Sequence, residues 1–112
     1  MNSGAELYVQ GVTRNALGET LVIAIPNNRV NVKVGDLLTL RYEIAHKDVL
    51  EATPNPERLN TKDVSLLVTK IEADRQGREI AELDAKSGAA AGFHLSGVGL
   101  EHVTPKCFLL AA

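Results

Sequence analysis

Apolar and polar residues alternate along most of this chain with a period of two, which is the spacing of a half-buried β-strand. The run RVNVKV at 29–34 shows it most clearly, with valines at positions 30, 32 and 34 on one face. The other alternating stretches are ELYVQGV (6–12), LLTLRYEI (37–44), DVSLLVTKIEAD (63–74), REIAELDA (78–85) and FHLSGV (93–98). Two further strand candidates, ETLVIAI (19–25) and KCFLLAA (106–112), are nearly continuous apolar runs. The pattern therefore predicts a chain of short strands.

The alternation also predicts which side chains share a face. In FHLSGV we expect Phe93 and Leu95 to point into the core, and His94 and Ser96 to lie on the outer face. In DVSLLVTKIEAD the apolar positions change phase near Thr69. The residues expected on a single face of LLTLRYEI are Leu38, Leu40, Tyr42 and Ile44.

Turn-forming residues separate these stretches. They include Asn15, Gly18, Asn27, Asn28 and the RQG run at 75–77. At 35–36, Gly35 permits the positive φ that a sharp turn needs, and the Asp36 carboxylate can bond back to the backbone. Frequent turns without a convincing amphipathic helix predict an all-β domain of six to seven short strands, which is either a closed antiparallel β-barrel or a sandwich.

Residues 45–62, AHKDVLEATPNPERLNTK, interrupt the strand pattern. Pro54 and Pro56 argue against a regular helix or a central strand there. We therefore expect one domain over residues 1–112 that carries a polar insertion loop at about 45–62. Long ordered loops are often functional, although a merely exposed insertion is the simpler interpretation.

Composition narrows the classes of function. The net charge is −2, and the 12 basic residues are scattered, so no stripe is available to neutralise a nucleic-acid backbone. The four aromatic residues offer few platforms for stacking bases. The single cysteine, Cys107, cannot form an internal disulfide, which fits a reducing compartment. Beside Phe108 it is expected to be a small buried apolar residue. With no signal-like N-terminus and no long apolar run, we expect a cytoplasmic protein with no membrane contact.

Groups capable of catalysis are present but do not form a known pattern. The candidate nucleophiles and bases are Ser96, Cys107, His46, His94 and His102. HLSGVG lacks the glycines of a nucleophile elbow, and the histidine and cysteine spacing fits no zinc motif. Glu101 and His102 are adjacent, so they would point to opposite faces of a strand and could converge only in a turn. We expect no catalytic residue, no metal and no cofactor.

Three motifs in order resemble a known family. They are VNVKVGDLLTL (30–40), VTKIEADRQGREIAEL (68–83) and AAGFHLSGVGLEHVTPKCFLLA (90–111). Together they resemble the domain II β-barrel of the translational GTPases, that is, elongation factor Tu and its relatives. The resemblance implies a closed barrel. The chain lacks the phosphate-binding sequence G-x-x-x-x-G-K-[ST], so we expect a free-standing, bacterial-type barrel that is not itself a GTPase.

The resemblance also implies a position for a site. In the family, the acidic turn before the last strand lies at the aminoacyl-acceptor pocket, and Glu101 matches its acidic position. Ser96 replaces an arginine of the family, Gly99 and Leu100 replace basic turn residues, and Lys106 replaces a glycine. Loss of those cations weakens the expected attraction for an RNA end.

The prediction is therefore a non-enzymatic binding module that recognises a protein partner. One expected contact surface is the acidic turn with Glu101 and His102, and His94 and Ser96 are further candidate binding residues. The second lies in the insertion, and its residues are Val49, Leu50 and Leu59. The alternatives are an accessory factor that binds RNA, tRNA or the ribosome, and, third, a small-molecule-binding barrel or an enzyme that uses a histidine. Self-association is also possible.

Overall fold

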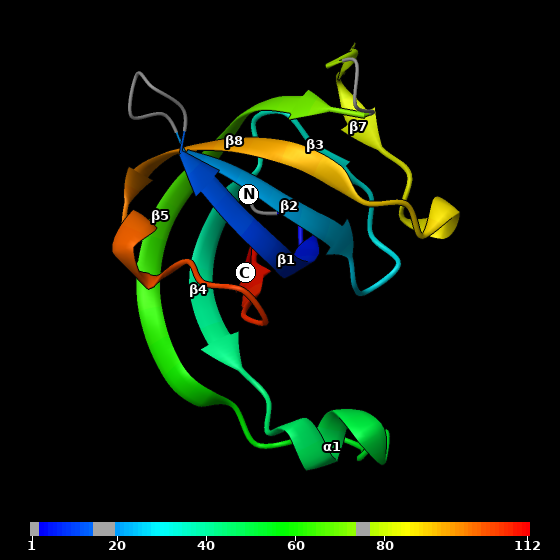
Figure 1. Cartoon of the computed structure of the whole chain (residues 1–112), viewed down its shortest axis with the longest axis vertical. Coiled ribbons are helices and arrows are strands. Elements are labelled where there is room, and N and C mark those ends of the chain that lie inside the picture. The colour runs from blue at the N-terminus through cyan, green and yellow to red at the C-terminus, as the bar shows by residue number, and fades with distance from the viewer. Residues whose placement is uncertain (1–2, 15–19, 74–76) are drawn as a thin grey trace.

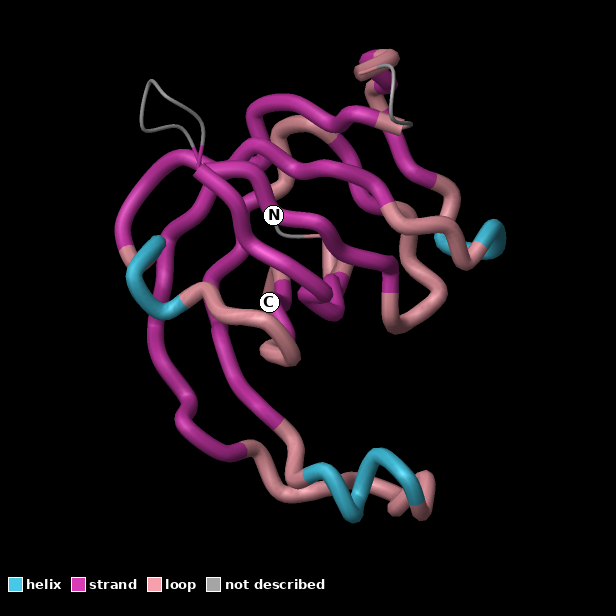
Figure 2. The backbone as a smooth tube through the Cα atoms, viewed as in Figure 1, coloured by secondary structure: helices cyan, strands magenta, loops and turns pink. Residues whose placement is uncertain are grey.

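The computed structural model describes residues 3–14, 20–73 and 77–112. Strands make up most of the described structure, and short helical segments lie between them (Figure 1, Figure 2). The elements are β1 (Glu6–Arg14), β2 (Thr20–Pro26), β3 (Val32–Lys33), β4 (Leu37–Glu43), α1 (His46–Leu50), β5 (Leu59–Glu72), β6 (Glu79–Ile80), β7 (Glu82–Leu83), η1 (Ala85–Ser87), β8 (Ala91–Val98), η2 (Leu100–His102) and β9 (Phe108–Leu110).

Six strands pair in a ring. The order is β4-β9-β1-β2-β8-β5, and β5 pairs in turn with β4. Every described pairing is antiparallel. β6 adds to β5 beside the ring, while β3 and β7 form a separate two-stranded sheet. The all-β prediction is thus confirmed.

The core fills the inside of this ring with mostly aliphatic side chains, and the aromatic ring of Phe93 is the largest fully buried side chain in it. Phe93 and Leu95 are buried as the alternation predicts. The other fully buried large side chains are Leu7, Val9, Val22, Val32, Leu38, Leu66, Val68, Ile71, Cys107 and Leu109. The change of phase in β5 is also confirmed, because the β5–β8 register shifts between Val68 and Lys70.

The turn at Gly35 and Asp36 forms as the sequence predicts. Gly35 has a φ of 100°, and the Lys33 backbone N–H donates to Asp36 Oδ2 at 2.9 Å. Val34 directly before the turn is 44% exposed, although the RVNVKV alternation groups it with the core valines. The strand β3 ends at Lys33, so the alternation stops there. The expected turn residues Asn15 and Gly18, and most of the turn expected at 75–77, lie outside the described residues.

The expected single face of LLTLRYEI is wrong. The β4–β5 register shifts between Leu38 and Leu40, so Leu38 is buried in the core while Tyr42 lies opposite Phe108 in the β4–β9 pairing. Arg41 is consequently 6% exposed. The shift exchanges the inner and outer faces along this part of β4.

The segment 45–62 is more regular than the sequence suggests. It contains the helix α1, and β5 begins within it at Leu59. The two prolines exclude a helix only around their own positions, and α1 ends before the first of them, Pro54. β4 and β5 run on past the neighbouring strands to α1 (Figure 1). We call residues 43–62 the arm. None of the described helices is long and apolar enough to cross a membrane.

Candidate functional site

His94 lies on the outer face of β8, as predicted, but its side chain is only 20% exposed. Its Nε2 atom lies 3.5 Å from Glu72 Oε2 on β5. The Thr69 hydroxyl donates to the His94 backbone carbonyl at 3.1 Å, beside the register shift in β5. The neighbouring strand therefore covers a side chain that we expected to be exposed.

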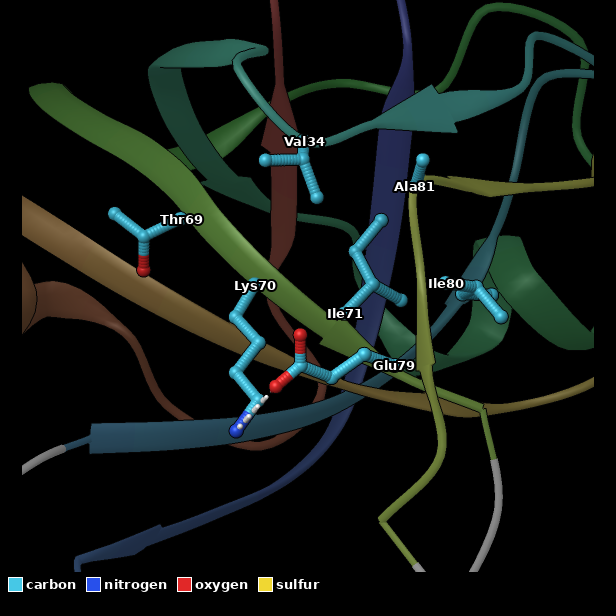
Figure 3. Close-up of a pocket in the computed structure, with 7 residues that line it drawn as sticks. All are labelled: Val34, Thr69, Lys70, Ile71, Glu79, Ile80 and Ala81. Carbon is cyan, nitrogen blue, oxygen red and sulfur yellow. Dashed lines mark ion pairs between the residues drawn. The ribbon is translucent and has the colours of Figure 1, made fainter.

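The Glu72 carboxylate belongs to a chain of charges. Lys70 Nζ lies 3.3 Å from Glu72 and 3.2 Å from Glu79, and Figure 3 shows the Lys70 and Glu79 side chains pointing toward one another. Burial raises the pKa of Glu72, but the interactions of its carboxylate with Lys70 and His94 lower the pKa by more than burial raises it. The net shift of the Glu72 pKa is therefore downward. Glu79 and then Glu72 raise the pKa of Lys70. A hollow of about 360 Å³ lies beside these charged side chains, and Val34 and Ile80 also line it. Its charged groups, Lys70 and Glu79, already pair with each other.

His94 and Ser96 line a second hollow of about 390 Å³, with Thr20 and Leu100 on its walls. His94 and Ser96, both predicted as binding residues, thus line one cavity together with Leu100 at the start of the acidic turn. Its polar groups are an imidazole and hydroxyls, which are suited to hydrogen bonding with a neutral ligand group.

The acidic turn is the short helix η2, and it brings its two ionisable side chains together. His102 Nε2 lies 3.5 Å from Glu101 Oε1, and the Glu101 side chain is 71% exposed. The turn thus gives the convergence that a strand could not. An exposed pair of this kind contributes little to stability, so both groups remain available to a partner.

Arg41 connects this turn to the arm. Its guanidinium donates from Nε to the His102 carbonyl at 2.6 Å and from Nη2 to Thr104 Oγ1 at 2.8 Å. Nη1 donates to Glu43 Oε2 at 2.6 Å and to the Asn60 carbonyl at 2.9 Å. One buried side chain therefore holds two predicted contact surfaces in a fixed relation, since Asn60 follows Leu59.

These contacts predict an acid-sensitive contribution to stability. Hydrogen bonds from Arg41 and Asn60 hold the pKa of Glu43 below its ordinary value. A lowered pKa means stability that is present above the unfolded-state pKa and lost as the pH falls through the folded-state value. Between about pH 5 and pH 3 the wild-type free energy of unfolding should therefore fall more steeply than that of Glu43→Gln, in urea titrations at each pH. Parallel curves over this range would show that Glu43 contributes nothing.

An aromatic row crosses three strands beside the arm. Tyr8 on β1, Phe108 on β9 and Tyr42 on β4 are direct partners in the strand register. Phe108 lies between the two tyrosines, with ring centroids 5.0 Å from Tyr8 and 5.1 Å from Tyr42. The Arg58 guanidinium lies 4.5 Å above the Tyr42 ring, which is cation–π geometry. The row therefore attaches the returning part of the arm to the sheet.

A buried carboxylate fixes the end of this row. Glu6 accepts a hydrogen bond of 2.5 Å from the Tyr42 hydroxyl and one of 2.6 Å from Asn27 Nδ2. Burial raises the pKa of Tyr42 far above its ordinary value, and the Glu6 carboxylate adds to this, against the opposing effect of Arg58. The phenol therefore stays protonated and remains a donor at neutral pH.

The insertion residues lie on this arm. Val49 is 52% and Leu50 73% exposed on α1, while Leu59 is half-buried at the start of β5. A hollow of about 370 Å³, which we call the arm pocket, lies between α1 and the aromatic row. Its lining residues are Tyr8, Glu43, Ile44, His46, Val49, Lys106 and Phe108.

Cys107 is fully buried, and burial raises the pKa of its thiol. This confirms the prediction of a small buried apolar residue and makes the thiol a poor nucleophile. Over the described ranges, His, Cys, Asp and Glu side chains form no group of three or more that could hold a metal ion.

Sequence reasoning missed Arg41 and the aromatic row. The signal for Arg41 was a charged residue inside an apolar strand, which marks either an exposed edge or a buried and fully bonded group. The row carried no signal, because Tyr8, Tyr42 and Phe108 come from strands distant in sequence.

Comparison with known proteins supports the fold. No family model and no curated protein matches this chain. Among solved structures, translation elongation factor SelB from Methanococcus maripaludis, in its apo form, is similar with a TM-score of 0.61 at 19% identity. The match covers 96% of this chain and 19% of that chain, so the chain spans about a fifth of the length of SelB. The chain thus has the fold of a translation-factor β domain.

Proposed function

We propose that this chain is a non-enzymatic binding module, built as a closed barrel like domain II of elongation factor Tu, and that its arm recognises a protein partner. The lone buried Cys107 fits a reducing compartment, and we propose a cytoplasmic location. The fold that this chain shares with a translation elongation factor supports a role in binding. The fold alone does not identify the partner.

The exposure of α1 carries the proposal. None of the five described residues of this helix is buried, and Leu50 at its end is 73% exposed. A five-residue helix is too short to be stable by itself, so packing normally decides whether such a turn persists. Val49 and Leu50 are consecutive exposed apolar residues, and exposed apolar residues that lie together, unlike single ones, are typical of a surface that a partner covers.

The attachment of the arm supports the same interpretation. Arg41 bonds the inner side of the arm to η2, and Arg58 stacks on Tyr42. A surface that is held in place loses less conformational entropy on binding than a mobile one. Glu101 and His102, which are tied to the arm through Arg41, would form the second contact.

Loss of the two exposed apolar residues should abolish partner binding. We expect the wild-type protein to retain a partner from a lysate of the source cell, and Val49→Ser/Leu50→Ser to lose about nine tenths of it. Val98→Ser is the matched control, because Val98 is also 73% exposed but lies on β8. The measurement is quantitative mass spectrometry of the captured proteins, with a photo-crosslinking residue at position 50 to show direct contact.

Equal retention by the arm variant and the Val98 control would contradict the proposal.

The second candidate function is association with the ribosome, which the fold of a translation factor favours. In that case ribonuclease would release the captured material, and its retention would fall steeply with salt. A second copy of this chain as the crosslinked product would instead indicate self-association.

A further inference from the structure

We propose that the arm pocket binds an acidic peptide segment of the partner, with a carboxylate on Lys106 and an apolar side chain against Tyr8 and Phe108. This deepens the proposed function and rests on it. The inference depends on three features of the pocket, namely its apolar walls, its charge and the backbone of Lys106.

The walls form a site for one apolar side chain. Phe108 and the half-buried Tyr8 come from the sheet, and Ile44 and Val49 come from the arm. The volume of about 370 Å³ exceeds that of a single large side chain and leaves room for the adjoining peptide. Apolar walls with a few polar groups at their edge are the usual form of such a binding site.

The charge of the pocket is complementary to a carboxylate. Glu43, the acidic residue of the lining, is already bonded to Arg41 at 2.6 Å and to Asn60 Nδ2 at 3.0 Å. Within the described ranges, no carboxylate forms an ion pair with the Lys106 ammonium. Among the described residues, Lys106 is therefore a cation of this pocket that has no carboxylate counter-ion, and His46 also lines the pocket.

The Lys106 backbone is the third feature. Lys106 has a φ of 73°, in the left-handed region that glycine adopts freely and that a residue with a Cβ adopts at a cost. Its N–H donates to the Val9 carbonyl at 2.7 Å, so the turn holds that conformation. A lysine in this conformation strains the backbone at a position that suits glycine. A functional role for the lysine side chain would explain why the strain is kept.

Two glycine substitutions separate this role from strain alone. Lys106→Gly removes the cation and relieves the backbone. Arg29→Gly does the same at another exposed cation, because Arg29 has a φ of 66° and does not line the pocket. Both variants should raise the melting temperature by about 3 °C. Only Lys106→Gly should weaken peptide binding, by about tenfold.

The probe is the peptide Ac-Glu-Leu-Phe-Glu-NH2, titrated to millimolar concentration into the full ¹⁵N-labelled chain. We expect chemical-shift changes at Tyr8, Val49 and Lys106, and weaker binding of Ac-Gln-Leu-Phe-Gln-NH2. The proposal is overturned if no shifts occur, if the glutamine peptide binds equally well, or if Lys106→Gly and Arg29→Gly bind alike. It is also overturned if an oligouridine displaces the peptide at a concentration below the dissociation constant of the peptide, because the pocket would then prefer RNA.

Failure here is distinguishable from failure of the proposed function. If the peptide fails but Val49→Ser/Leu50→Ser still loses the captured partner, the arm binds a protein by a different chemistry. If that variant retains the partner, the arm is not the docking surface at all.

Discussion

Replacing Arg41 with alanine is expected to lower the free energy of unfolding by about 3 kcal/mol. The guanidinium is buried and donates to the carbonyls of His102 and Asn60, to Thr104 and to Glu43. Its loss removes four hydrogen bonds, and of these acceptors Glu43 keeps a donor in Asn60 Nδ2. Because small domains are stable by only roughly 5–15 kcal/mol, this is a large fraction of the total. Urea unfolding at pH 7, followed by circular dichroism, measures it.

Two controls make the Arg41 result specific. Arg14→Ala, at the exposed end of β1, should change stability by less than about 0.5 kcal/mol. Arg41→Lys keeps the charge but not the planar fork of donors, so it should recover less than half of the loss. If Arg41→Ala is no more damaging than Arg14→Ala, the link between the arm and η2 is not structurally important.

Gly97→Ala is expected to be about as damaging, with a loss of about 3 kcal/mol. Gly97 has a φ of 141°, and a Cβ at this position would overlap the Ser65 backbone oxygen on β5. That oxygen belongs to a paired strand, so it cannot move away without disturbing the β5–β8 ladder. The same strand leads into η2, and the acidic turn should be displaced as well.

The matched control for Gly97→Ala is Gly11→Ala. Gly11 lies on β1, and an added Cβ there has nothing within 4 Å. Its substitution should change stability by less than about 0.5 kcal/mol. Equal unfolding midpoints for the two variants would show that the close approach of β5 and β8 tolerates a methyl group.

The pattern of the sequence was sufficient for the all-β class, for the longer strands and for most of the core. It was not sufficient for the strand expected at 29–34, which is only Val32–Lys33, or for REIAELDA, which forms two short strands in different sheets. The alternation in FHLSGV placed Phe93 and Leu95 inside, and the Gly35-Asp36 turn formed with the bond that its residues predict. Cys107 was correctly expected to be buried. These features depend on period, on turn chemistry and on the size of single residues, all of which are local.

The candidate site was predictable only in part. Val49 and Leu50 are exposed in the segment that broke the strand pattern, although a helix was not expected there. Glu101 and His102 were singled out, but their convergence depends on a turn of 3₁₀ type. The contact between His94 and Glu72 could not be predicted, because it needs the register of β5 against β8.

By itself, then, the sequence determined the all-β class, the inner face of most strands and the positions of several turns, because each follows from neighbouring residues. Only the tertiary structure decided that Arg41 lies inside, since a register shift between two strands exchanges their faces. It likewise decided that Lys106 and Val49 line one pocket. Contacts between residues far apart in the chain depend on strand order and register, which the alternation of single strands does not encode.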